Sequence, residues 1–269
     1  MLIAEIGWNF MGDMELADSM IRAASEAGAT DVKFQYWRED LLRAGPWDDD
    51  GRREIYKSAQ LDDGLILKLS SIAKDCGLRA FYSAFSKEGL LKLHSLGQTV
   101  IKVPSHEIYN IELIELSLSL FDKVIISTGA CNENELISVA KACASFSGEL
   151  VVMHCVSSYP CAPEIMNLSR LNSLKALFPN AVLGLSDHTS SALIPAISAA
   201  FGVKVVEKHF TTDHDLPGRD NKFALLPSEF REMALNFNMA LQACTYRGMN
   251  AQDSEQDIMQ NYRGRWGGI

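Results

Sequence analysis

Two histidines, His188 and His209, each follow a short apolar run, residues 181–185 in one case and 203–206 in the other. An Ala-rich segment of helical length, residues 192–201, lies between the runs, and this order predicts a β-α-β unit. Parallel strands end at the same edge of a sheet, so we expect the two imidazoles to lie side by side. A pair of imidazoles suits Mn, Fe, Co or Zn better than Ca or Mg. The alternative is that each ring is only a hydrogen-bonded part of the structure.

Hydroxyl, lysine and acidic side chains recur at the ends of the other predicted strands. Taken in chain order, the strand-end residues are Glu5, Lys33, Gln35, Ser83, Lys102, Ser105, Glu107, Ser127, Thr128, His154, Ser157, Tyr159, Ser186, His188, Glu207, Lys208 and His209. Any single serine in such a set is more often a turn or cap residue. Together, lysines as point charges and hydroxyls as neutral donors predict a pocket for a phosphate or carboxylate substrate.

Two carboxylates near these strand ends add further chemistry. Glu107, two residues beyond Ser105, is placed to act as a general base if the pocket shifts its pKa. The alternative for Glu107 is a salt bridge to a neighbouring lysine. Asp220 ends a polar Pro-Gly loop that we expect over the pocket mouth, where a carboxylate accepts hydrogen bonds from sugar hydroxyls. Solvation of the loop is the alternative for Asp220.

These residues need a scaffold that brings every strand end to one edge. We count eight strand-like runs and eight helical runs in strict alternation. Such alternation requires parallel strands with helical crossovers, and eight units within about 245 residues predict a closed (β/α)8 TIM barrel, with its active site at the carboxyl ends of the strands. A doubly wound open sheet is the alternative, but no Gly-x-Gly-x-x-Gly follows the first strand. A long polar connection, residues 36–61, is a lid, a binding loop or disordered.

Composition narrows the function classes. The 269 residues are 47% hydrophobic and 22% charged, with mean hydropathy near zero, as in ordinary soluble proteins. A net charge of -9 and a pI of about 5.2 give no indication of a nucleic-acid partner. Six cysteines without CxxC spacing and without a secretory signal predict reduced thiols in the cytoplasm. No apolar run reaches the roughly 18 residues of a membrane span.

Eight short motifs, in order over nearly the whole chain, resemble those of the sialic acid synthase family. They are IAEIGWNFMGD from Ile3, VKFQ from Val32, IKVPSHE from Ile101, ISTGA from Ile126, MHCVSSYP from Met153, GLSDHT from Gly184, EKHF from Glu207 and LPGRD from Leu216. Each motif alone is weak, but eight in sequence are highly specific. The family, which includes N-acetylneuraminate, legionaminic and pseudaminic acid synthases, condenses phosphoenolpyruvate with an amino sugar to a nine-carbon 2-keto acid.

The resemblance implies a role for each matched position. Glu107 is the implied base, Glu5 is a further catalytic acidic group, and His188 and His209 hold a divalent metal, manganese, with Mg or Co as alternatives. The implied phosphoenolpyruvate contacts are Lys33, Ser83, Lys102, Ser105, Ser127, Ser157 and Ser186, and the implied sugar contacts are Gln35, Tyr159 and Asp220. The implied reaction is a metal-dependent carbon–carbon bond-forming transfer that releases phosphate, with N-acetylmannosamine or a related 2,4-diamino hexose as the acceptor.

The chain also departs from the family pattern. We expect residues 1–249 to form the synthase barrel and residues 250–269 to form a tail, too short for the antifreeze-like domain that members commonly carry. In such members that domain supplies an arginine to a partner's barrel, so we expect Arg263, Arg265 or a separate antifreeze-like protein to replace it, with a homodimer as one assembly. Phe10 departs from the family's usual Asn-His-x-Gly, and Ser83 replaces a common Thr, which predicts a divergent acceptor site.

Two other functions are consistent with the same residues. One is another phosphoenolpyruvate-dependent synthase that makes a shorter 3-deoxy-2-keto acid, which assays with acceptors of different length would separate. The other is a non-catalytic barrel that binds sugar or phosphate, although the retained histidines and lysines argue against lost catalysis.

Overall fold

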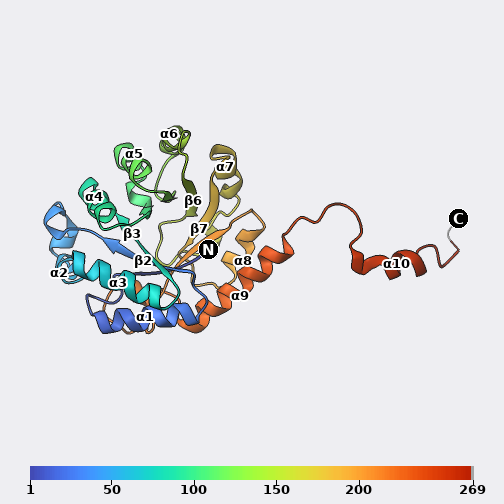
Figure 1. Cartoon of the computed structure of the whole chain (residues 1–269), viewed down its shortest axis with the longest axis horizontal. Helices are drawn as coiled ribbons and strands as arrows, with labels where there is room; N and C mark the ends of the chain where they lie inside the picture. Colours follow the sequence, from blue (N-terminus) through green and yellow to red (C-terminus); the bar gives the residue numbers. More distant parts are fainter. Residues whose placement is uncertain (268–269) are drawn as a thin grey trace.

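The computed structural model describes residues 1–267 and contains a closed barrel of eight parallel strands (Figure 1). Each strand pairs with the next along the chain, and β8 pairs with β1 to close the barrel. The strands are β1 Leu2–Gly7, β2 Asp31–Tyr36, β3 Arg79–Ala84, β4 Val100–Val103, β5 Lys123–Ser127, β6 Glu149–Cys155, β7 Val182–Asp187 and β8 Val205–His209. The predicted (β/α)8 TIM barrel is therefore confirmed.

Helices surround the strands on the outside of the barrel (Figure 1). They are α1 Met14–Glu26, α3 Asp63–Asp75, α4 Lys87–Ser95, α5 Ile111–Leu120, α6 Glu133–Cys143, α7 Arg170–Leu177, α8 Ile194–Ala199 and α9 Pro227–Ala243. Two more helices, α2 Arg52–Ser58 and α10 Gln256–Asn261, lie in the connection after β2 and in the segment after α9. Polar side chains cap several of them, as when Asp13 accepts hydrogen bonds from the first turn of α1. Eight of the helices follow the predicted alternation, whereas α2 and α10 lie outside it.

Alternation along each strand separates the inner face of the barrel from its outer face. One buried apolar cluster fills the interior below the polar strand ends, and a larger one lies between the strands and the helices. The interior cluster consists of Ile3, Phe81, Val100, Ile125, Val151, Met153 and Val205. Residues two positions further along these strands, such as Glu5 after Ile3, therefore point into the barrel at its carboxyl end.

The same alternation corrects two expectations about strand-end residues. Lys208 points outward, where its buried Nζ lies 2.9 Å from Asp187 Oδ2. His154 also points outward, with its Nε2 2.6 Å from the carbonyl oxygen of Met166. Their inward neighbours, Glu207 and Cys155, face the cavity instead.

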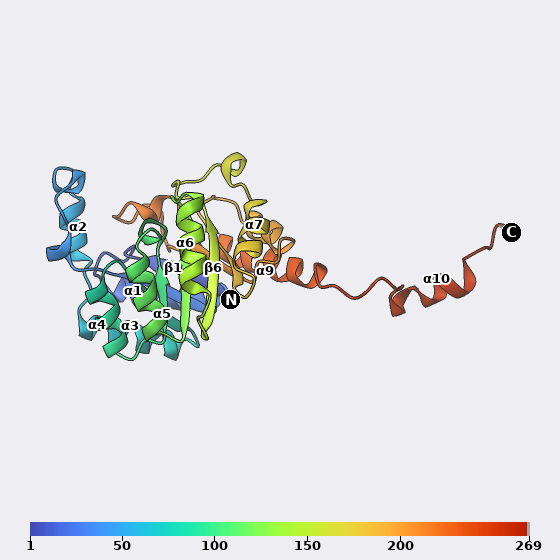
Figure 2. The same ribbon diagram turned by 90° about the horizontal axis from the view of Figure 1, so that it is seen from above.

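The long connection after β2 is an ordered part of the structure. It contains helix α2 and two short 3₁₀ turns, Glu39–Leu41 and Pro46–Asp48. Figure 2 shows α2 standing out from the barrel at the upper left. Arg53 forms ion pairs with both Glu39 and Asp48, so the connection is held together by its own side chains. Of the three alternatives for a loop this long, disorder is therefore wrong.

The segment after α9 extends away from the barrel (Figures 1 and 2) and carries the exposed helix α10. Neither Arg263 nor Arg265 reaches the cavity of this chain, and the Arg265 guanidinium lies 5.0 Å from the rings of both Tyr262 and Trp266. The expected division of the chain at residue 249 stays a prediction. Among residues 1–267, none of the helices is both long and apolar enough to span a membrane.

Candidate active site

The carboxyl ends of the strands open into one cavity of about 810 Å³, the position at which barrel enzymes bind their substrates. Thirteen of the fourteen site residues predicted from the sequence line this cavity. They are Glu5, Lys33, Gln35, Ser83, Lys102, Ser105, Glu107, Ser127, Tyr159, Ser186, His188, His209 and Asp220. The fourteenth, Ser157, is exposed and lies outside the lining, with its Oγ 3.8 Å from Cys155 Sγ.

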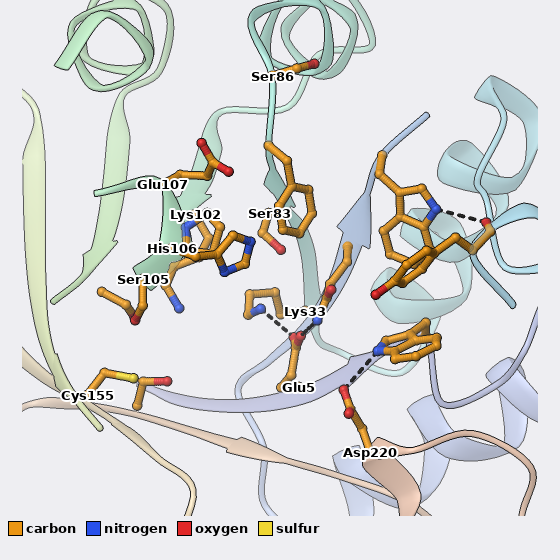
Figure 3. A pocket seen from close by; sticks show the side chains of 18 of the residues that line it. Glu5, Lys33, Ser83, Ser86, Lys102, Ser105, His106, Glu107, Cys155 and Asp220 are labelled. Atoms are coloured by element: carbon orange, nitrogen blue, oxygen red, sulfur yellow. Dashed lines mark hydrogen bonds and ion pairs between the residues drawn. The ribbon is translucent and has the colours of Figure 1, made fainter. Parts of the chain in front are cut away.

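Two lysines and two glutamates form a buried ion-pair network on the floor of the cavity. Lys102 Nζ lies 2.8 Å from both carboxylate oxygens of Glu207. Lys33 Nζ lies 2.7 Å from Glu5 Oε2, as Figure 3 shows, and 3.9 Å from Glu207 Oε1, which joins the two pairs. Ser186 donates a further hydrogen bond to Glu207 Oε1 at 3.2 Å. The network has two positive and two negative members, all buried.

Burial and pairing act against each other in this network. Burial raises the pKa of Glu5 and lowers the pKa of Lys102. Burial acts to raise the pKa of Glu207 as well, but the ammonium groups of Lys102 and Lys33 outweigh it and lower that pKa to about 2. Glu207 is therefore ionised at neutral pH and holds both lysines where an anionic ligand would meet them.

Hydroxyl groups beside the floor are in position to bind an anion. Ser127 Oγ is buried and has no hydrogen-bond partner within residues 1–267, which is the feature expected of a group that meets a ligand. Ser105 Oγ accepts a hydrogen bond from the Gly129 backbone N–H at 3.1 Å. A side chain at Gly129 would displace these hydroxyls, since a Cβ there would lie 2.5 Å from Ser157 Oγ and 2.9 Å from Ser105 Oγ.

The two histidines lie side by side, with ring centroids 5.5 Å apart. His188 Nδ1 lies 2.8 Å from the carbonyl oxygen of Val156, which can only accept, so Nδ1 carries a proton and Nε2 holds a lone pair whenever the ring is neutral. Burial acts to lower the pKa of His188, but its contacts with Cys155 and Val156 outweigh burial and raise that pKa. His209 Nδ1 is buried without a hydrogen-bond partner among the described residues, and Asp220 Oδ2 is 3.8 Å away. Burial and the neighbouring His188 hold the pKa of His209 well below its usual range, so its ring is neutral.

This donor set fits a divalent metal with two protein ligands. Both rings line the cavity, and the orphaned Nδ1 of His209 is the unsatisfied atom expected at such a site. No cluster of three His, Cys, Asp or Glu side chains within residues 1–267 is arranged around one metal position. The remaining coordination positions would therefore belong to substrate and water.

Asp220 connects the histidine pair to Trp8, which follows β1, the strand beside β8. Its Oδ2 accepts a hydrogen bond from Trp8 Nε1 at 2.8 Å, drawn as a dashed line in Figure 3. Burial raises the pKa of Asp220, although the Trp8 N–H opposes the shift. The Tyr159 ring lies 4.2 Å from the His188 ring, and Gln35 donates to Glu5 Oε1 at 2.7 Å. The predicted sugar contacts thus surround the histidine pair and the edge of the floor.

Glu107 lies on the rim of the cavity, on the short turn after β4 (Figure 3). Partial burial raises the pKa of its carboxyl, which is the direction needed for a base that works near neutral pH. Within residues 1–267 no lysine or arginine forms an ion pair with Glu107, so the salt bridge considered above is absent there.

Several cavity residues were not among the predicted contacts. Cys155 follows Val151 and Met153 at a spacing of two, so strand alternation would have placed it inside the barrel. Burial acts to raise its pKa, but the contacts with His188, Ser105 and Lys102 together outweigh burial and lower that pKa to about 7. Aromatic residues of the loops also line the cavity, and no strand pattern could have found them. Phe10, by contrast, is buried against Phe34 and is not among the residues that line the cavity.

Known proteins share this sequence and arrangement. The NeuB family model matches residues 20–247, which is most of the barrel. The chain belongs to the NeuB family. Among NeuB relatives, the pseudaminic acid synthase of Campylobacter jejuni is 32% identical over 275 residues, which cover 97% of this chain and 78% of that protein. The N,N'-diacetyllegionaminic acid synthase of Legionella pneumophila is 34% identical over 248 residues, which cover 86% of this chain and 69% of that protein.

Solved structures agree with this NeuB assignment. The N-acetylneuraminic acid synthetase of Leptospira borgpetersenii, solved with citrate, matches with a TM-score of 0.89 at 28% identity, over 98% of this chain and 92% of that one. A 3-deoxy-D-arabino-heptulosonate 7-phosphate synthase of Thermotoga maritima matches with a TM-score of 0.69 at 13% identity, over 90% of this chain and 86% of that one, and shows the shared fold alone.

Proposed function

We propose that this NeuB chain joins phosphoenolpyruvate to the aldehyde carbon of an N-acylated amino hexose and releases phosphate. The C3 carbon of phosphoenolpyruvate forms the new bond to the aldehyde carbon, whose oxygen takes a proton and becomes a hydroxyl. Water adds to C2, and the C2–O bond to phosphate breaks, which leaves a nine-carbon 2-keto acid. Its similarity to three kinds of sugar-acid synthase supports this reaction.

The floor of the cavity is the observation that carries the proposal. Two buried ammonium groups and several hydroxyls face one end of a cavity in an otherwise acidic chain. A phosphate or carboxylate that arrives there would exchange the Glu207 and Glu5 contacts of the lysines for its own charge-assisted hydrogen bonds. The buried Ser127 hydroxyl would gain the partner that it lacks. Holding phosphoenolpyruvate in this way fixes C3 toward the histidine pair.

We also propose that His188 and His209 hold a divalent metal, which we expect to be manganese. When bound, the metal supplies Lewis acidity to the aldehyde oxygen of the acceptor. Val156 orients His188 through its carbonyl oxygen, and burial keeps the ring of His209 unprotonated. Asp220, beside His209, is placed to accept hydrogen bonds from the acceptor hydroxyls, and Tyr159 covers the histidine pair.

Glu107 is the group that we propose to take a proton from the attacking water. Its carboxyl is part of the rim, faces the cavity and is not committed to an ion pair within the described residues. A raised pKa makes it a stronger base than an exposed glutamate. Glu5 is fixed by Lys33 and Gln35, so it positions the floor lysine.

The first experiment measures phosphate release by the purified chain with manganese, phosphoenolpyruvate and a panel of amino-sugar acceptors, with mass detection of the keto acid. Turnover should depend on the acceptor, stop on chelation and return with manganese. His188→Ala should abolish turnover and lower manganese affinity, measured separately by titration calorimetry. His94→Ala, which changes an exposed histidine of α4, is the matched control and should retain both.

A different experimental outcome would contradict each part of the proposed function. Turnover that survives chelation and His188→Ala would refute the metal role and leave the condensation standing. Phosphoenolpyruvate binding without turnover on any acceptor would refute the condensation and favour a binding barrel. A product shorter than nine carbons would identify the shorter-chain synthase.

A further inference from the structure

Five aromatic side chains form a continuous wall along one side of the cavity. Trp8 follows β1, Trp37 and Tyr56 belong to the connection after β2, Phe85 follows β3, and His106 follows β4. We call these five residues the aromatic wall. Its ring centroids are 5.6 Å apart for Trp8 and Tyr56, 5.7 Å for Trp37 and Tyr56, 6.4 Å for Trp37 and Phe85, and 5.3 Å for Phe85 and His106. Each ring thus contacts the next.

The indoles of the aromatic wall have no N–H group left for a ligand. Trp8 Nε1 donates to Asp220 Oδ2 at 2.8 Å, and Trp37 Nε1 donates to the carbonyl oxygen of Tyr56 at 2.9 Å. Phe85 has no polar atom, and it stacks on His106 with an angle of 19° between the ring planes. Apart from the Tyr56 hydroxyl and the His106 ring nitrogens, the wall therefore presents ring faces and ring edges to the cavity, which suit apolar groups.

The aromatic wall lies where the far end of an acceptor sugar would be. This step rests on the proposed function, which places the aldehyde of the acceptor at His188 and His209. Asp220 Oδ2 lies 3.8 Å from His209 Nδ1 and also accepts the Trp8 hydrogen bond, so one carboxylate touches both regions. A sugar that extends outward from the histidine pair past Asp220 meets the wall with the carbons most distant from its aldehyde.

We propose that the aromatic wall selects acceptors that carry apolar groups, such as N-acyl methyls or a deoxygenated terminal carbon, on those distant carbons. Burying one methyl group increases affinity by about fourfold. A hydroxyl pressed against ring faces loses water without gaining a partner, which reduces affinity by at least about fivefold. A doubly N-acylated deoxyhexose should therefore exceed a hexose with free hydroxyls by about tenfold or more in kcat/KM.

A test compares three acceptors on the full chain with manganese and phosphoenolpyruvate: a 2,4-diacetamido-2,4,6-trideoxyhexose, N-acetylmannosamine and N-acetylmannosamine 6-phosphate. The third sugar is included because Arg43 and Arg219 also line the cavity. The deoxygenated sugar should give the highest kcat/KM. Trp37→Ser should reduce its advantage over N-acetylmannosamine by about tenfold, whereas Trp266→Ser, which changes an indole of the exposed tail, should leave the ratio unchanged.

Binding measurements separate this inference from the proposed function. Titration calorimetry with manganese and without phosphoenolpyruvate gives the affinity of each sugar when no turnover can occur. Equal affinities and equal kcat/KM for the first two sugars, or a preference for the 6-phosphate, would overturn the role of the wall while turnover upheld the condensation. A preference in binding without any turnover would uphold the wall and overturn the condensation. Binding of none of the sugars would overturn the wall as an acceptor site, and phosphoenolpyruvate affinity in Trp37→Ser shows whether that variant is folded.

Discussion

Replacing Glu207 with Gln removes the charge that joins the two floor lysines while keeping nearly the same side-chain volume. Lys102 would lose one of its two accepting oxygens at 2.8 Å, because a Gln amide keeps only one, and both Lys102 and Lys33 would lose the negative charge beside them. All three side chains are buried, so water cannot replace the lost charge. The variant leaves two ammonium groups in the interior with only Glu5 to balance them.

The pKa of the Glu207 carboxyl gives the size of the expected loss of stability. The pKa of Glu207 falls from 4.5 to about 2 in the folded chain, and a shift of that size corresponds to about 3 kcal/mol of stability at neutral pH. Breaking a buried ion pair typically costs about 3–5 kcal/mol of stability, which is consistent with the value derived from the pKa shift. We expect Tm to fall on the order of 10 °C. Because the pKa is lowered on folding, this contribution is complete above pH 4.5 and is lost as the pH falls toward 2.

Thermal unfolding of Glu207→Gln and the parent chain between pH 5 and pH 8 measures this difference. Glu149→Gln is the control, because Glu149 pairs with Lys123 at 2.8 Å but is half exposed, and such pairs contribute about 0–1 kcal/mol. The reasoning is refuted if Glu207→Gln unfolds within a degree of the parent at pH 7, or if the difference between them grows as the pH falls.

Three further predictions test the floor and the rim. Lys102→Met should raise the KM for phosphoenolpyruvate about 10- to 100-fold in steady-state assays, whereas Lys208→Met should destabilise the chain and leave that KM unchanged, because Lys208 points out of the barrel; equal KM effects would contradict this. Gly129→Ala should cost about 1–3 kcal/mol in thermal unfolding and weaken phosphoenolpyruvate binding by displacing Ser105, unless the hydroxyls move aside freely. Because burial raises the pKa of Glu107, kcat/KM should fall as the pH drops through that pKa, and Glu107→Gln should lose this limb of the pH profile; an unchanged limb would exclude Glu107 as its origin.

The barrel and its floor could be predicted because two simple periodicities determine them. Alternating apolar runs of strand and helix length imply parallel strands, and parallel strands bring their carboxyl ends together. Lys33, Lys102 and His209 therefore lie in one cavity although the sequence separates them widely. Strict use of the spacing of two would also have excluded His154 and Lys208, since each is one residue out of phase with an inward neighbour.

The aromatic wall could not be predicted because loops follow no such period. Trp37 and Tyr56 meet only because the connection between them folds back on itself. That fold depends on specific contacts, such as those of Arg53, which a pattern of apolar residues does not contain. Ser157 shows the same limit, since it follows β6 in a loop and lies just outside the cavity.

The connection after β2 is stabilised by contacts among its own residues, so it can be exchanged between related barrels as one unit. Arg53 pairs with Glu39 and Asp48 and donates to the carbonyl oxygen of Leu42 at 3.1 Å, and all of these residues belong to the connection itself. The sequence of the connection therefore determines its own conformation, whereas the residues proposed to form the new carbon–carbon bond lie at the ends of the strands. Grafting residues 37–61 onto a related barrel should transfer the preference for one sugar without disturbing the chemistry. Under the proposed function, a change of acceptor in this family would require remodelling of a single connection.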